Sequence, residues 1–79
     1  MTIKEFMEHQ GAQSAVADRM GVTRQNVNLW VNGRLKVSVP SAIKVSKVLA
    51  ELGVQATPAE VIMYFNERRE AREKEMSED

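Results

Sequence analysis

The chain of 79 residues contains no cysteine and only one histidine, His9. The first absence excludes disulfides, thiolate metal sites and a cysteine nucleophile, and a single histidine argues against a zinc site of the ordinary type. No Ser-His-Asp set can form around a lone histidine near a helix end, and no glycine-rich phosphate loop occurs. We therefore expect no enzyme, no metal and no other cofactor.

Long apolar runs are also missing. None approaches the roughly 18 residues that a membrane span needs, and the N-terminus lacks the apolar core of a signal peptide. A cytoplasmic protein without a membrane partner is the expectation. The length suits one domain, predicted over residues 1–75, and so small a domain hides only about 60–65% of its unfolded surface, so a partner subunit would add stability.

Helix signals dominate what is present. Thr2 and Glu5 have the spacing of a capping box, and the apolar stripe that follows predicts a helix over residues 3–10. Gly11 is its expected end, because glycine adopts the left-handed conformation at little cost.

Two short helices are predicted next, over residues 12–20 and 24–31. Gly21 is the expected end of the first. Thr23 is a suitable N-cap for the second, and Gly33 its expected stop. Three residues, 21–23, therefore join the two helices.

Residues 34–39 alternate apolar with polar side chains, which is strand periodicity. A segment this short cannot form a sheet alone, so an extended linker is predicted, and a short edge strand over 35–39 stays open. Pro40 suits the first turn of a fourth helix, which Gly53 closes.

The clearest helix start is Thr57-Pro58-Ala59-Glu60, with a cap, a proline at the first position and a capping-box glutamate. A C-terminal helix is predicted from about residue 58 to about Glu75, followed by a frayed tail over 76–79. The predicted fold class is all-α, a compact bundle of five helices.

The zero net charge hides a segregation of charge along the chain. From Arg19 to Ala50 there are six basic residues and no acidic one, whereas residues 51–79 carry eight acidic and four basic residues. A base-only stretch over the third and fourth helices is what a surface facing phosphates needs. A solvated face with chance asymmetry is the alternative.

The tight turn of residues 21–23 makes two short helices cross steeply, which is helix-turn-helix geometry. Buried contacts then recur at fixed offsets, here at Gln13, Ala17, Gly21, Val27 and Trp30. This pattern resembles the helix-turn-helix of phage Cro and lambda-type repressors through about residues 13–33, and the flanking helices extend the resemblance to about 2–53.

The resemblance implies a lambda-repressor-like fold and a homodimeric, sequence-specific protein that binds double-stranded operator DNA and represses transcription. It would act in the cytoplasm of a bacterial host, at the nucleoid when bound, with no small-molecule ligand. The alternative is a protein-interaction or antitoxin-like module that uses its C-terminal helix.

With Val27 and Trp30 directed inward, the opposite face of the third helix holds side chains that match base edges. The expected base readers are Arg24, Gln25, Asn28 and Leu29. Arg24 reads a base or holds a phosphate, and a merely polar solvent face is the alternative. Trp30 is expected in the core rather than as a stacking platform for single strands.

Side chains at helix starts and after the third helix are expected to contact backbone phosphates. The expected phosphate contacts are Gln13, Thr23, Asn32, Arg34, Lys36 and Lys44. Resemblance supports Gln13, and the role of Thr23 as N-cap competes with a contact.

Residues 61–65 are consecutively apolar, so both sides of the C-terminal helix are expected to be covered. Val61 and Phe65 are predicted to dock on the core, and Ile62 and Met63 to form a dimer interface. A helix covered wholly by its own domain is the alternative. The acidic residues of the tail are expected to lie away from DNA, because phosphates repel them.

Overall fold

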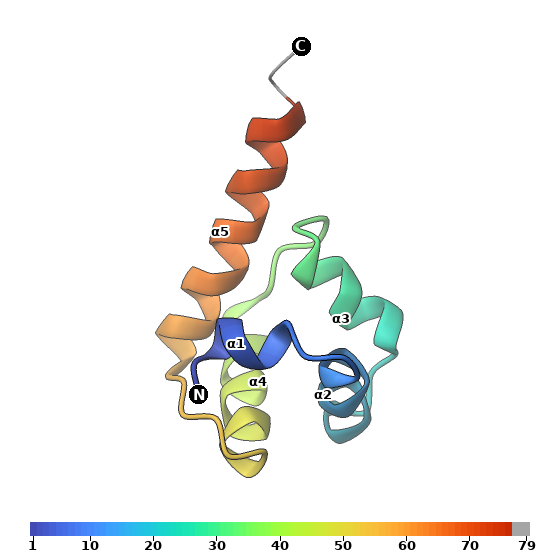
Figure 1. Cartoon of the computed structure of the whole chain (residues 1–79), viewed down its shortest axis with the longest axis vertical. Helices are drawn as coiled ribbons and strands as arrows, with labels where there is room; N and C mark the ends of the chain where they lie inside the picture. Colours follow the sequence, from blue (N-terminus) through green and yellow to red (C-terminus); the bar gives the residue numbers. More distant parts are fainter. Residues whose placement is uncertain (77–79) are drawn as a thin grey trace.

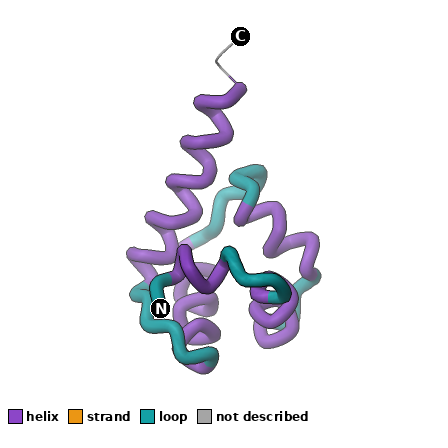
Figure 2. Tube along the Cα trace, in the orientation of Figure 1, coloured by secondary structure: helices purple, strands orange, loops and turns teal. Residues whose placement is uncertain are grey.

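The computed structural model describes residues 1–76, with only the backbone of the last two. The part described is built from helices and contains no strand (Figures 1 and 2). The helices are α1 Ile3–Met7, α2 Ala12–Met20, α3 Arg24–Val31, α4 Val39–Glu51 and α5 Pro58–Met76. The predicted all-α bundle and its helix-turn-helix, α2 and α3, are confirmed.

Side-chain caps set where four of the helices begin. The hydroxyls of Thr2, Thr23, Ser38 and Thr57 each accept a hydrogen bond from the backbone N–H three residues on, at 3.1–3.3 Å. Each cap satisfies a donor that has no partner within its own helix. Thr23 therefore acts as the N-cap that its position predicts.

The first helix is shorter than predicted. α1 ends at Met7 instead of residue 10, and Gly11, at φ 85°, is the N-cap of α2 instead of the end of α1. The chain changes direction here, α1 packs against α2, and Ala12 at the start of α2 is buried. Residues 8–11 form the turn that this packing requires.

The alternative of a strand over residues 35–39 is wrong. Residues 36–38 have no regular structure, and Val39 already begins α4, with Pro40 as its second residue. In a strand, Leu35, Val37 and Val39 would share one face, but only Val37 reaches the core, while Leu35 and Val39 are exposed. The alternation of apolar residues therefore reflects a linker in which one of the three side chains, that of Val37, is buried in the core.

The C-terminal helix docks through the side predicted for it. Val61 and Phe65 are fully buried, and the Phe65 ring lies 6.0 Å from that of Trp30 in α3. α5 packs mainly on α4 and also contacts α1 and α3. Its second half projects beyond the other helices along the long axis of the molecule (Figure 1).

Gly33 allows the backbone of α5 to pass close to the loop after α3. At φ 72°, a Cβ on this residue would lie 2.7 Å from the Arg68 carbonyl oxygen and 2.8 Å from the Arg69 Cα. Only glycine allows backbones to approach so closely. The second half of α5 is therefore held against the end of the helix-turn-helix.

The domain boundary near residue 75 stays a prediction, because the described residues end at Met76. Met76 is the last residue of α5, and the rest of the predicted frayed tail, 77–79, lies outside the described residues. Over residues 1–76, no helix combines the length and the apolar character that crossing a membrane would require.

Candidate nucleic-acid interface

The helix-turn-helix is built as its offsets predict. Ala17 is buried at the contact between α2 and α3, and Val27 and Trp30 point into the core. Gly21 ends α2 in the left-handed conformation, at φ 71°. The interpretation of Trp30 as a core residue is confirmed, and the remaining face of α3 is left to polar side chains.

The first turn of α3 presents Arg24 and Gln25 to solvent, while Asn28 and Leu29 are half-buried further along the same helix. The outward direction of Arg24 and Gln25 follows from the inward direction of Val27 and Trp30. In a helix-turn-helix that binds DNA, the N-terminal part of the second helix enters the major groove. Arg24 and Gln25 lie in that part of α3.

A chain of side-chain amides connects the two helices. Asn28 Nδ2 donates to Gln13 Oε1 at 3.0 Å, and Asn32 Nδ2 donates to Asn28 Oδ1 at 2.8 Å. Gln13 belongs to the first turn of α2 and Asn32 follows α3. The amide of Asn28 is thereby held from both ends before any ligand arrives.

The amide chain still has hydrogen-bonding capacity to spare. Each amide has two N–H donors and a carbonyl oxygen with two lone pairs, so Asn28 keeps one N–H and one lone pair. These are the two groups that pair with the N7 and N6 atoms of adenine. Gln13 and Asn32 keep N–H groups that can donate to phosphate oxygens.

The six basic residues of the base-only stretch do not form one patch. Arg19 Nη1 lies 3.4 Å from Glu51 Oε2, so it is paired with the end of α4. Lys36 shares a depression of about 260 Å³ with Arg69, Glu70 and Glu73 of α5. Both cations therefore have acidic neighbours.

Other predicted phosphate contacts are placed differently. Arg34 is exposed and lines the same depression as Asn32. Lys44 is exposed on α4, which packs mainly on α2 and α5. No hydrogen bond or ion pair within the described part of the chain connects Lys44 to α3. The structure thus brings Gln13, Asn28 and Asn32 into one chain and sets Arg34 beside Asn32.

Two arginines to which the sequence analysis gave no role join this region. Arg68 and Arg72, one turn apart on α5, line a depression of about 370 Å³ together with Asn32 and Arg34. Their spacing of four residues, which puts them on one helix face, is the signal in the sequence. That this face would meet the end of α3 depends on the docking of α5.

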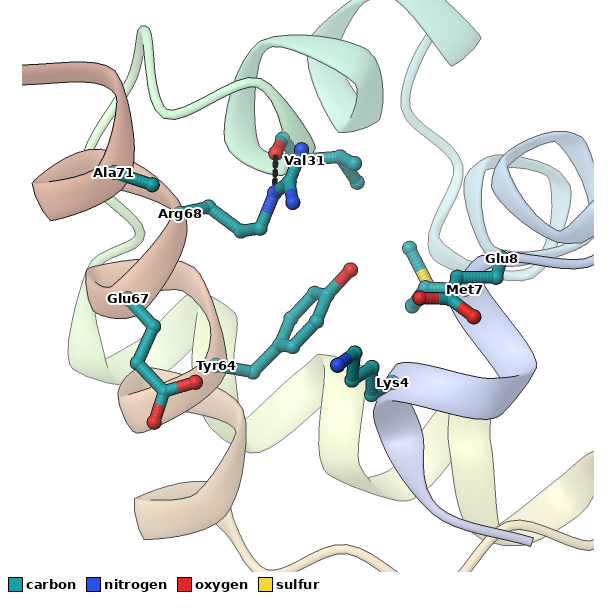
Figure 3. A pocket seen from close by; sticks show the side chains of 8 residues that line it. All are labelled: Lys4, Met7, Glu8, Val31, Tyr64, Glu67, Arg68 and Ala71. Carbon is teal, nitrogen blue, oxygen red and sulfur yellow. Dashed lines mark hydrogen bonds between the residues drawn. The ribbon is translucent and has the colours of Figure 1, made fainter. Parts of the chain in front are cut away.

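Arg68 also ties α5 to the recognition helix. Its Nε donates to the carbonyl oxygen of Val31, the last residue of α3, at 2.9 Å (Figure 3). The last carbonyls of a helix lack partners within it, and a cation there also complements the helix dipole. This bond caps α3 from a residue 37 positions away.

The ring of Tyr64 projects into an adjacent depression of about 240 Å³ between α1 and α5, near Lys4, Met7 and Arg68 (Figure 3). Burial raises the pKa of the Tyr64 phenol, the positive charge of Arg68 lowers it, and the negative charge of Glu8 raises it by a smaller amount. The net shift is upward, so this phenol is neutral near pH 7.

The match to a known family agrees with this geometry. The model of the helix-turn-helix family matches residues 3–57, from α1 to the residue before α5. Searches of curated proteins and of solved structures gave no significant match. The matched region holds the crossing helices, their buried contacts and the amide chain. The chain therefore belongs to the helix-turn-helix family of DNA-binding transcription regulators.

Proposed function

We propose that this protein is a transcriptional repressor of the phage Cro type that binds a palindromic operator as a homodimer, with α3 of each copy in a major groove. The observation that carries the proposal is the amide chain Gln13–Asn28–Asn32 beside the exposed Arg24 and Gln25. A prearranged amide loses little freedom on binding a base edge, which favours sequence-specific binding in the host nucleoid.

The contacts divide into two classes. Arg24, Gln25, Asn28 and Leu29 are the proposed base readers, with Arg24 also able to hold a phosphate. Gln13, Thr23, Asn32, Arg34, Lys36 and Lys44 are the proposed phosphate contacts, which position the protein without reading sequence. Lys36 contributes least, since it has acidic neighbours. The hydroxyl of Thr23 accepts the N–H of Asn26 as the N-cap and keeps its O–H as a donor for a phosphate.

The dimer is proposed to form through Ile62 and Met63. Met63 is 60% exposed although it lies between the buried Val61 and Phe65, and Ile62 is half-buried. An exposed apolar side chain beside a docked face leaves surface for a second copy. Two-fold symmetry would set two recognition helices about 34 Å apart, one turn of DNA.

Selection of bound duplexes from random DNA tests the function. We expect enrichment of one inverted repeat, with affinity that falls steeply as salt rises. Equal, negligible binding to every duplex would contradict the proposal and favour a protein-interaction or antitoxin-like module, in which α5 binds another protein through Met63.

A further inference from the structure

Three cations lie near the end of α3 without an acidic partner. Within residues 1–74, whose side chains the structure describes, no ion pair involves Arg34, Arg68 or Arg72. The next arginine on α5, Arg69, does have an acidic partner, because its Nη2 lies 3.8 Å from Glu73 Oε1. Arg34, Arg68 and Arg72 all line one depression.

The depression has a layout that suits an anion. It is lined by Asn32, Arg34, Arg68, Ala71 and Arg72, and none of the side chains described there is a carboxylate. Arg68 is already oriented, because its Nε donates to the Val31 carbonyl, which leaves the Nη groups of its guanidinium for a ligand. Arginine donors in a fork match the oxygens of a phosphate.

The acidic residues of α5 lie on other sides of this helix. Glu70 and Glu73 line the depression that contains Lys36. Glu67 lines the two that contain Lys4, one of which Arg68 borders from its other side. Arg68 and Arg72, four residues apart, share one face. The helix therefore separates its charges around its circumference, although its sequence reads as a mixed acidic tail.

We infer that Arg34, Arg68 and Arg72, with the amide of Asn32, form a clamp for one backbone phosphate of double-stranded DNA, so that α5 extends the interface beyond the helix-turn-helix. The clamp lies directly after α3, at the end of the amide chain that reaches the base-reading face. α5 projects past α3 on this side of the molecule (Figure 1). The inference rests on the proposed function.

Arg72→Gln tests the clamp, because Arg72 makes no hydrogen bond or ion pair within the described side chains. Arg69→Gln is the matched control, with the same loss of charge on the neighbouring face. We expect Arg72→Gln to weaken binding about tenfold at low salt. The loss should be equal on a selected duplex and an unrelated one, and the slope of log K against log salt should fall by about one.

Three further variants keep the test decisive. Arg34→Gln should weaken binding as Arg72→Gln does. In the double variant Arg34→Gln/Arg72→Gln, the slope of log K against log salt should fall little more than in either single variant. Arg72→Lys should keep the slope of the unaltered protein, because it keeps the charge. Thermal unfolding of every variant should match that of Arg69→Gln.

The outcomes separate the clamp from the function. If the unaltered protein selects duplexes but Arg72→Gln and Arg34→Gln bind as Arg69→Gln does, the clamp is overturned and the proposed function stands. If the unaltered protein binds no duplex, or binds only single strands or RNA, both are overturned.

Discussion

At the scale of residues, Asn28 has the central position in the proposed interface. Its amide bonds to α2 through Gln13 and to the end of α3 through Asn32. The sequence analysis predicted a contact with DNA for each of the three residues separately. It did not predict the bonds among them, because Gln13 and Asn28 lie 15 positions apart and meet only after the helices cross.

Replacement of Asn28 by alanine removes the amide that we propose to pair with a base edge. We expect a loss of about 1–3 kcal/mol of discrimination at one base-pair position of each half-site, with other positions unchanged. Quantitative binding to single-base variants of the selected duplex measures this. Gln55→Ala, an exposed amide in the α4–α5 connection, is the control. A loss of equal size on every sequence would make Asn28 a phosphate contact instead.

Tyr64 makes the stability of the fold sensitive to alkali. Its pKa is raised in the folded protein, chiefly by burial, whereas the pKa of tyrosine in an unfolded chain is about 10. The favourable contribution of the neutral phenol is therefore complete below about pH 10 and is lost as the pH rises through the folded pKa.

The single tyrosine of the chain makes this measurable. Tyrosinate absorbance of the folded protein should develop above about pH 10, and the free energy of unfolding should fall less with alkali in Tyr64→Phe than in the unaltered protein. The prediction would be refuted if the tyrosine titrated as in an unfolded chain and the free energy of unfolding fell equally with alkali in both proteins.

At the scale of elements, local sequence signals were enough to predict the helices but not which residues the helices contact. Caps such as Thr23 and the glycine at position 21 act within a few residues, so α2 and α3 agree with their predicted bounds. The end of α1 and the conformation of the linker before α4 depend on packing against other parts of the chain. The periodicity of apolar residues does not predict that packing. The same holds for Arg68, which caps α3 from α5.

Gly33→Ala is expected to loosen α5 from the loop after α3. The left-handed backbone alone costs about 1–2 kcal/mol for a residue with a Cβ, and the Cβ would also collide with the backbone of Arg68 and Arg69. Gly53→Ala is the matched control, because Gly53 is also left-handed, at φ 84°, but has open space around it.

Urea unfolding should show a larger loss of stability for Gly33→Ala than for Gly53→Ala. Fluorescence of Trp30, which packs on Phe65, should shift to the red in the first variant only, because displacement of α5 lets water reach the indole. Equal losses of stability in the two variants and an unchanged fluorescence spectrum would mean that the loop after α3 moves and α5 stays in place.

At the scale of the whole molecule, the proposed dimer depends on an apolar side chain that the fold leaves exposed. Met63→Glu places a charge there and should convert a dimer into a monomer in sedimentation experiments, with weaker binding to the inverted repeat. Gln55→Glu adds the same charge at an exposed position away from Met63 and should remain a dimer. A dimer that survives Met63→Glu would exclude this interface.

The sequence by itself determined the five helices, the crossing of α2 and α3, the inward position of Trp30 and the polar face opposite it. These depend on caps, on turn glycines and on the spacing of apolar residues, all of which act over a few positions. The tertiary structure alone decided which cations keep an acidic partner. It also brought Arg68 and Arg72 to the end of the recognition helix, because that placement follows from the docking of Val61 and Phe65 and from the close approach of two backbones at Gly33.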